Sequence, residues 1–267
     1  MQLSDCNYKF GGTVVLAYPD VTRLAGYRAA VGLWIHLLTR GGSSNICTAK
    51  FDSVAAVEET VQALGAPELN STSEFVVFGT PASLPQVTFC FVNGMPAAEH
   101  VPVLVDQIVG VLEAHGVERL VVPAAADIGG IRESDRLWAV HSTESGLLQQ
   151  QQQRLASMEI QPLPEGAYTN DVFLSTLDNI GSVSGIKDVC ILVHGDKRPS
   201  GSGYRQTVTF GSEFIDESDA SLVLYLGNAL AAVAASGAVG EPPVRAELVT
   251  RTRLNADSIA RALPAFG

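Results

Sequence analysis

Short apolar runs along the chain alternate with segments in which apolar residues recur every three or four positions. The first run, Thr13–Tyr18, is rich in β-branched residues and predicts a strand. The segment after it predicts a helix that ends at Gly41–Gly42, and residues 46–51 then predict a second strand. The helical spacing is carried by Leu24, Tyr27, Val31, Trp34, Ile35 and Leu38.

The next part of the chain continues with a helix and a pair of strands. Residues 52–64 predict a helix with Asp52 or Ser53 as its N-cap. Residues 74–79 and 86–92 are two β-rich runs on either side of a short segment that contains two prolines. This arrangement predicts a hairpin or two neighbouring strands.

The second half of the chain repeats the alternation. Residues 101–116 predict a long helix, and residues 117–124 predict a strand whose two faces are both apolar, which is typical of a sheet covered on both sides. Acidic residues mark the beginning of the last predicted helix, where they interact well with the helix dipole. The later predicted strands are residues 137–141, 188–195 and 204–211, and the later predicted helices are residues 171–180 and 217–237. The acidic residues at the beginning of the last helix are Asp216, Glu217 and Asp219.

Strands that alternate with helices predict an α/β sandwich, and the hairpin predicts that its sheet is mixed. We expect one domain, residues 1–267, because no segment has the composition of a long linker. Hydrophobic residues make up 46% of the chain and charged residues 17%, which indicates an ordinary packed core.

The net charge of −11 narrows the expected partners. An acidic protein repels phosphate backbones and anionic lipids, so we expect neither a nucleic-acid nor a membrane partner. The most apolar segment, residues 221–235, is shorter than the roughly 20 residues of a membrane span and contains Asn228. The amino-terminal residues lack a basic region followed by an apolar stretch, so no secretory signal is expected.

The chain carries none of the strong catalytic motifs, such as GxSxG, HExxH or a phosphate-binding glycine loop. The histidines and cysteines are scattered rather than clustered, so we expect no metal, no cofactor and no catalytic residues. His115, beside a glycine, is expected at a helix C-terminus. Buried free thiols in a reducing compartment are expected for Cys6, Cys47, Cys90 and Cys190.

One loop has features of an enzyme. Residues 194–205 follow an apolar strand, and Lys197, Arg198 and Arg205 lie there among glycines that could cradle an anion. The alternative function is therefore a phosphorylase- or hydrolase-like enzyme that binds an anion at this loop. We favour a solvated hairpin loop, because no acid or nucleophile is tied to these residues by spacing.

Three segments of the chain carry distinctive patterns in a fixed order. Ser71–Val92 has a serine- and acid-led strand, a short polar turn, and a second strand of alternating aromatic residues and cysteine. Residues 142–158 contain Ser-Gly-Leu followed, after a run of glutamines, by Arg-Leu-Ala. Residues 163–193 have a Pro–acid start, Asn-Asp before a helix, and then an apolar strand. In these segments the chain resembles the proteasome assembly chaperone family, specifically the first subunit of the eukaryotic chaperone pair.

The resemblance implies a three-layer sandwich whose sheet is nucleoside-phosphorylase-like, without enzymatic activity. It implies a heterodimer with a second assembly-chaperone subunit, which acts on proteasome α subunits during assembly of the α-subunit ring of the core particle. The cytoplasm and the nucleus are the expected compartments. Members of the family form heterodimers, and the mean hydropathy of this chain is +0.21. We therefore expect the isolated chain to expose an apolar patch of the order of several hundred Å².

The resemblance also assigns a function to the carboxyl-terminal tail, residues 263–267. Family members end in a hydrophobic residue, a tyrosine and any residue, which enter pockets between α subunits, and the matching positions are Ala265, Phe266 and Gly267. Pro264 fixes its own φ and favours an extended tail. Phe266 lacks the tyrosine hydroxyl, and with it a hydrogen bond worth roughly 0.5–1.5 kcal/mol. The alternative is that Phe266 packs on its own domain.

Overall fold

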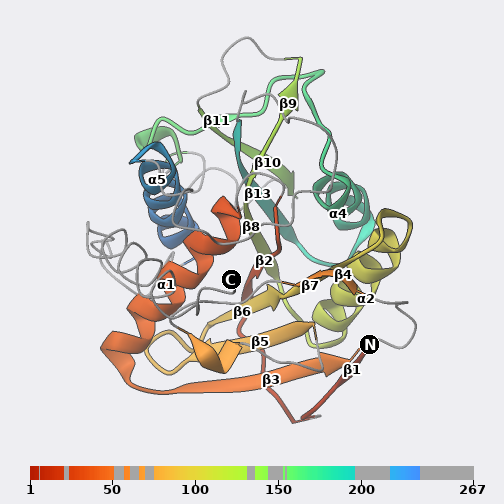
Figure 1. The fold of residues 1–267 in the computed structure, drawn as a ribbon, viewed down its shortest axis with the longest axis vertical. Coiled ribbons are helices and arrows are strands. Elements are labelled where there is room, and N and C mark those ends of the chain that lie inside the picture. Colours follow the sequence, from red (N-terminus) through yellow and green to blue (C-terminus); the bar gives the residue numbers. More distant parts are fainter. Residues whose placement is uncertain are drawn as a thin grey trace, which may run out of the picture.

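A mixed β-sheet forms the middle of the molecule, with helices on both of its faces (Figure 1). The structure is a computed structural model, which describes residues 1–5, 7–20, 24–50, 57–60, 66–69, 75–130, 136–143, 153, 155–195 and 217–234. In the described residues the sheet has nine strands in the order β1-β3-β5-β6-β2-β8-β13-β10-β11. These strands are β1 (Gln2–Leu3), β2 (Thr13–Ala17), β3 (Ser44–Lys50), β5 (Val76–Pro81), β6 (Val87–Val92), β8 (Arg119–Ala126), β10 (Leu137–Thr143), β11 (Gln161–Pro162) and β13 (Asp188–Gly195).

Four adjacent strands in the centre, β6, β2, β8 and β13, run parallel to one another. Thr13 is in register with Val87 on one side and with Arg119 on the other, and Arg119 is in register with Asp188. The carboxyl ends of the four strands therefore lie at one edge of the sheet, which we call the carboxyl edge. On either side of this centre, β5 and β10 pair antiparallel to β6 and β13.

The helices divide into two layers (Figure 1). Helices α1 and α5 contact each other on one face of the sheet, and α2 and α4 contact each other on the opposite face. The longer helices are α1 (Ala25–Gly41), α2 (Val101–Ala114), α4 (Val172–Val183) and α5 (Glu217–Ala234), with short 3-10 turns η1 (Pro67–Leu69) and η2 (Ala98–His100). Two small two-stranded sheets complete the described elements, formed by β4 (Val57–Thr60) with β7 (Gly94–Pro96) and by β9 (Ile128–Gly129) with β12 (Tyr168–Thr169).

Side-chain alternation along the strands feeds two hydrophobic cores. In β2, Val15 and Ala17 point towards α1 and α5, whereas Val14 and Leu16 point towards α2 and α4. Successive side chains of a strand face opposite sides of its sheet, so a strand that is covered on both faces must be apolar at every position. This explains why β6, whose six residues are all buried, appears in the sequence as an unbroken apolar run.

Most of the predicted elements are confirmed, including the mixed sheet and the hairpin. The hairpin is β5–β6, in which Val76 is in register with Val92. Helix α1 ends as predicted, with Gly42 in the left-handed conformation at φ 70°. The strand predicted at residues 204–211 lies outside the described residues.

The helix predicted over residues 52–64 is wrong where the structure describes that segment. Residues Val57–Thr60 form strand β4, which pairs antiparallel with β7. The apolar spacing of the segment is compatible with a helix, but its backbone groups find partners on β7 at Gly94 and Met95. Tertiary pairing of this kind overrides a weak local preference.

Gly26 sets how closely helix α1 approaches the sheet. A Cβ atom at this position would lie 2.1 Å from the backbone oxygen of Pro123 on β8 and 2.7 Å from Cα of Ala124. No side chain relaxation can relieve these contacts because both atoms belong to the backbone. The first turn of α1 therefore lies directly on β8, and only glycine permits that approach.

We predict that Gly26→Ala destabilises the fold by about 1–3 kcal/mol or more, because the added methyl group must push α1 off the sheet. Gly110→Ala is the matched control, since Gly110 is exposed on helix α2 and nothing lies within 4 Å of a Cβ built there. This control should stabilise by about 0.4–1 kcal/mol. Urea unfolding measures both changes, and equal effects of the two substitutions would contradict the close approach.

Candidate functional site

The carboxyl edge is the place where α/β proteins with parallel strands bind ligands, and the strand order here changes direction at β2. Strand β6 lies on one side of β2 and β8 on the other, and α2 connects those two strands across one face of the sheet. Strand β9, which directly follows β8, lies at this edge, at the top of Figure 1. The candidate site at this edge consists of the polar side chains of Tyr18, Asp20, Tyr27, Asn93 and Asp171.

Asp20 binds the first turn of helix α1 with its own carboxylate. The Asp20 Oδ1 atom accepts a hydrogen bond from the backbone N–H of Ala25 at 3.2 Å, and Oδ2 accepts from Gly26 at 2.7 Å and from Tyr27 at 3.4 Å. The side chain is 2% exposed. The backbone N–H groups at the beginning of α1 are therefore already paired with a carboxylate that belongs to the chain itself.

Leu24, directly before α1, has a left-handed backbone with φ 57° and ψ 32°. This conformation costs a non-glycine residue of the order of 1–3 kcal/mol. Leu24 therefore carries backbone strain directly before the turn of α1 whose N–H groups face Asp20.

Asp171 performs the same function for helix α4. Its Oδ1 accepts a hydrogen bond from the backbone N–H of Leu174 at 3.0 Å, which makes it the N-cap of α4. Its Oδ2 accepts from the hydroxyl of Tyr18 at 2.7 Å, directly after β2. The Tyr18 ring also stacks on Phe173, with ring centroids 4.2 Å apart. Through Tyr18, the beginning of α4 is fixed to the central strand of the sheet.

Tyr27 and Asn93 extend the polar cluster to the carboxyl end of β6. The hydroxyl of Tyr27 donates to the Asn93 side-chain oxygen at 2.6 Å, and the Asn93 amide donates to the backbone oxygen of Leu69 at 2.5 Å. Asn93 is 4% exposed, and burial raises the pKa of the Tyr27 hydroxyl well above its usual range. These groups are held as neutral, internally bonded side chains.

The two carboxylates at this edge are difficult to keep charged. Burial raises the pKa of Asp20 well above its usual range, and the charge of Asp171 raises it further, against the hydrogen bonds from α1. Burial likewise raises the pKa of Asp171, against the hydrogen bonds from Leu174 and Tyr18. A phosphate or other anion would normally be attracted to a helix N-terminus. Here the carboxyl group of Asp20 occupies that position at α1 and accepts the backbone hydrogen bonds that an external anion would need.

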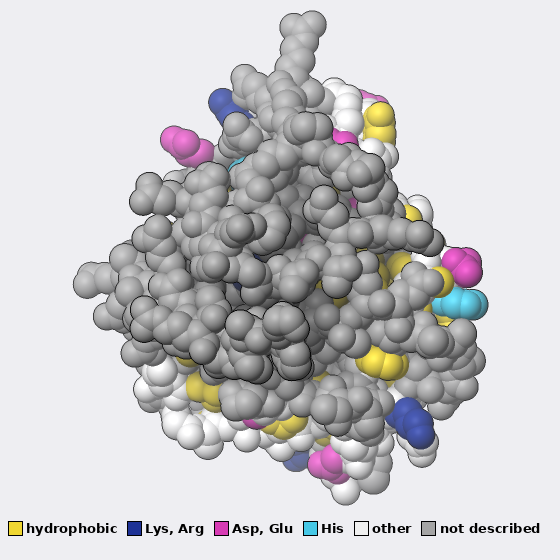
Figure 2. Space-filling model, viewed as in Figure 1, with side chains coloured by type: hydrophobic (Ala, Val, Ile, Leu, Met, Phe, Trp, Pro, Cys, Tyr) yellow, Lys and Arg dark blue, Asp and Glu magenta, His cyan; other side chains and the backbone are white. Residues whose placement is uncertain are grey.

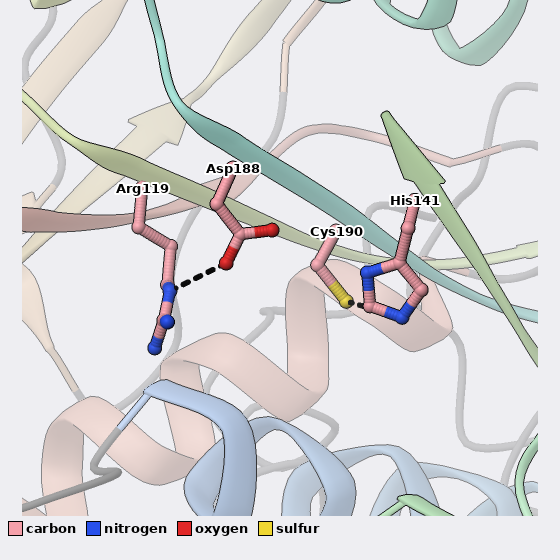
Figure 3. A network of polar contacts seen from close by, with 4 residues as sticks. All are labelled: Arg119, His141, Asp188 and Cys190. Atoms are coloured by element: carbon pink, nitrogen blue, oxygen red, sulfur yellow. Dashed lines mark hydrogen bonds and ion pairs between the residues drawn. The ribbon is translucent and has the colours of Figure 1, made fainter. Parts of the chain in front are cut away.

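A second polar network lies at the opposite edge, on the α1 and α5 face, and Figure 3 shows its four residues. The Nε atom of Arg119 donates to Oδ2 of Asp188 at 2.7 Å, which joins the beginnings of β8 and β13. The Asp188 side chain is fully buried. The Sγ atom of Cys190 lies 4.0 Å from Nε2 of His141 on β10.

The thiol and the imidazole of this network are unsuited to nucleophilic catalysis. Burial raises the pKa of Cys190 far above its usual range, so the sulfur stays protonated. Burial also lowers the pKa of His141, although the Asp188 charge acts in the opposite direction. An activated cysteine needs the reverse of both shifts. The network therefore serves to hold three strands together.

Most of the residues predicted to form a site lie outside the described part of the chain. The structure describes only His194 and Gly195 of the loop 194–205, and it places them at the end of β13, on the carboxyl edge. The tail residues Ala265, Phe266 and Gly267 lie outside the described residues. Within the described part of the chain, no group of His, Cys, Asp and Glu could hold a metal ion, and no helix is long and apolar enough to cross a membrane.

Reasoning from the sequence missed the Asp20 and Asp171 caps. Asp171 lies directly before α4, which is the usual position of a capping aspartate, whereas Asp20 lies five residues before α1 begins at Ala25. The pair Asn170–Asp171 belongs to the segments that resemble the chaperone family, but the resemblance gives this pair no structural function. Buried free thiols are confirmed for Cys47, Cys90 and Cys190. His115 lies at the C-terminus of α2 as predicted, where its ring contacts the backbone oxygen of Val111 at 2.8 Å.

The class defined by this architecture is an α/β protein with a large mixed sheet between helical layers, and solved structures with this fold exist. PbaA of Pyrococcus furiosus, described as an archaeal homolog of proteasome-assembly chaperone, is 14% identical at a TM-score of 0.55, covering 98% of this chain and 95% of PbaA. PbaB of the same organism, described as an archaeal proteasome activator, is 11% identical at a TM-score of 0.55, with 98% of each chain covered.

A third structure, a Thermoplasma acidophilum protein with unknown function, is 14% identical at a TM-score of 0.55, covering 96% of this chain and 88% of that one. At such identities the likeness shows a shared fold. No protein-family model matches the chain, and no curated protein matches it in sequence.

We predict that Asp171→Ala destabilises the protein by about 2–4 kcal/mol, since it removes a helix cap and leaves the buried Tyr18 hydroxyl without its acceptor. Asp171→Asn should cost less than Asp171→Ala, because asparagine still caps α4 and its amide can donate to the Tyr18 hydroxyl, although the hydroxyl proton loses its carboxylate acceptor. Chemical denaturation of both variants checks this. Equal losses would show that the capping geometry is wrong.

The raised pKa values of Asp20 and Asp171 predict a pH dependence of stability. A carboxyl whose pKa is higher in the folded state binds its proton more tightly there, so the free energy of unfolding rises as the pH falls from neutrality through the folded-state pKa. Asp20→Asn removes the contribution of Asp20, so the wild type should gain stability relative to this variant as the pH falls from neutrality towards the usual aspartate pKa of about 4. Asp127→Asn, at an exposed position, is the control for lost charge. A difference that does not change with pH would contradict the prediction.

Proposed function

We propose that this protein is a non-enzymatic chaperone that promotes assembly of the α-subunit ring of the proteasome core particle. The observation that carries the proposal is the fold, which extends over 98% of the chain in the likeness to PbaA, an archaeal homolog of proteasome-assembly chaperone. The likeness to PbaB, an archaeal proteasome activator, supports the same connection with proteasomes. The sequence resemblance to assembly chaperones supports it independently.

The state of the carboxyl edge supports a function without catalysis. In an anion-binding enzyme of this architecture, a helix N-terminus beside the switch strand would be open to the ligand. At α1 the N–H groups of Ala25, Gly26 and Tyr27 are instead paired with Asp20. The proposal therefore excludes phosphorolysis or hydrolysis at this position. It regards the nucleoside-phosphorylase-like sheet as a scaffold.

The proposal includes the finer features that the family resemblance implies. The chain is one domain, residues 1–267, and it forms a heterodimer with a second assembly-chaperone subunit in the cytoplasm and the nucleus. The heterodimer contacts proteasome α subunits through the tail, residues 263–267. There the ring of Phe266 enters an apolar slot between α subunits, and the terminal carboxylate lies near a lysine.

Burial of the ring contributes roughly 1.5–3 kcal/mol, whereas a carboxylate–lysine pair at an exposed rim contributes about 0–1 kcal/mol. We therefore expect Phe266→Ala, or deletion of Ala265–Gly267, to weaken binding to purified α-subunit intermediates by roughly 10- to 100-fold. The melting temperature should not change. A titration followed by fluorescence anisotropy and a melting curve measure the two quantities.

Phe266→Tyr is the matched control for this experiment. It restores the hydroxyl of the family pattern, so it should tighten binding by roughly 2- to 12-fold. If Phe266→Ala leaves binding unchanged and lowers the melting temperature, the ring belongs to the core of its own domain and the docking function of the tail is wrong.

A further inference from the structure

The two helical layers differ in how much of their surface reaches solvent. In the first layer, no side chain of α1 from Ala25 to Leu38 is exposed, and none of α5 is exposed between residues 222 and 234. In the second layer, α2 and α4 each present an exposed face. This face consists of Pro102, Val103, Asp106, Gly110, Glu113 and Ala114 on α2, and Asp178, Asn179, Ser182 and Val183 on α4.

This exposed face of α2 and α4, which we call the α2/α4 face, carries unusual apolar side chains. The three exposed large hydrophobic residues of the described chain are Val103 on α2, Val183 on α4 and Tyr168 on β12, with exposed fractions of 42%, 83% and 59%. Strand β12 contacts α4, so all three belong to one side of the molecule. Figure 2 shows hydrophobic side chains on the right-hand side, where α2 and α4 lie in Figure 1.

The α2/α4 face also carries charge of only one sign. The two helices have 14 and 12 residues, among which Asp106, Glu113 and Asp178 are charged and none is lysine or arginine. Three of the ten exposed residues of the face are charged, which lies within the roughly 25–35% typical of a solvated surface. The face is therefore distinguished by the single sign of its charge and by its exposed apolar side chains, a combination that fits a protein interface.

We propose that the α2/α4 face is the surface that docks the second chaperone subunit, and that the docked surface of this partner is apolar with lysine or arginine side chains opposite Asp106 and Asp178. The inference rests on the proposed function, to which it adds the surface and the chemistry of the partner. Charge complementarity selects a basic partner. A second copy of this chain is disfavoured, because a two-fold contact would bring acidic residues together without any basic side chain from these helices.

The dimensions of the face set the expected strength of the contact. Helices of 14 and 12 residues are about 18–21 Å long, and two neighbouring helices cover a width of about 20 Å, so the face offers on the order of 400 Å². A standard interface buries about 800 Å² on each partner. The α2/α4 face therefore supplies about half of such an interface, and the Tyr168 end of α4 extends it.

The test uses the complete chain co-expressed with the second assembly-chaperone subunit, with affinity measured by titration of the purified partner. The double variant Asp106→Lys/Asp178→Lys should weaken the complex by about tenfold or more and reduce its sensitivity to salt. Asp127→Lys reverses an exposed acid on the loop between β8 and β9 and should leave the affinity unchanged.

A matched pair at one position separates charge from size. Val183→Arg should weaken the complex, because it places a cation against the basic partner, whereas Val183→Glu should bind at least as tightly as the unchanged chain. Both substitutions lie at the exposed C-terminal end of α4. Equal affinities of the two variants would overturn the proposed charge complementarity.

The experiments distinguish failure of the proposed docking surface from failure of the proposed chaperone function. If Phe266→Ala weakens α-subunit binding while every α2/α4 variant binds the second subunit normally, the chaperone function is retained and the docking surface is wrong. If the unchanged chain does not associate with the second subunit, or forms a homodimer that Val183→Arg disrupts, the docking proposal is also overturned. In those cases the tail experiment still tests the connection with proteasomes on its own.

Discussion

The fold depends on a constraint at the carboxyl edge of its parallel strands. Four strands buried on both faces end at this edge, and helices α1 and α4 begin beside it, so backbone N–H groups converge in a region shielded from water. Unpaired buried N–H groups are costly, and Asp20 and Asp171 provide their acceptors. Because burial disfavours their charged forms, the pKa values of both aspartates are raised.

The pairing of these N–H groups with aspartates also determines which ligands the carboxyl edge can bind. In an α/β enzyme, helix N-termini at a switch strand remain open and bind a substrate or cofactor. Here Asp20 fills one of them, Tyr18 connects the other to the central strand, and Tyr27 and Asn93 bond to each other. The polar groups satisfy one another inside the protein. The N-termini of α1 and α4 are therefore closed to an external ligand in the described part of the chain.

The strands and the hairpin could be predicted because burial on both faces leaves a direct trace in the sequence. Strand β6 appears as the run Val-Thr-Phe-Cys-Phe-Val, in which all six residues are buried. Strand β4 could not be predicted, because its partner β7 lies more than thirty residues further along the chain and local spacing does not reveal the pairing. The amino-terminal segment was missed for a similar reason. Its Tyr8 hydroxyl contacts Thr80 at 2.8 Å, 72 residues away.

The candidate site was less predictable than the fold, since it depends on groups that meet only in three dimensions. The position of Asp171 directly before a helix indicates a cap, but nothing local indicates that Asp20 binds the beginning of α1 or that the two carboxyl groups lie near each other. The difference between the helical layers is likewise a property of packing. Helix α1 is apolar and covered, whereas α2 has similar apolar spacing and yet exposes Val103 and Asp106 on its outer side.

This difference assigns separate functions to the two layers. The α1 and α5 layer stabilises the sheet, because Gly26 brings α1 against β8 and the core between them contains no exposed side chain. The α2 and α4 layer stabilises the sheet with its inner side alone, so its outer side is free to vary without loss of the core. Since the carboxyl edge is occupied by its own aspartates, this outer side is where the described part of the chain combines exposed apolar side chains with acidic ones.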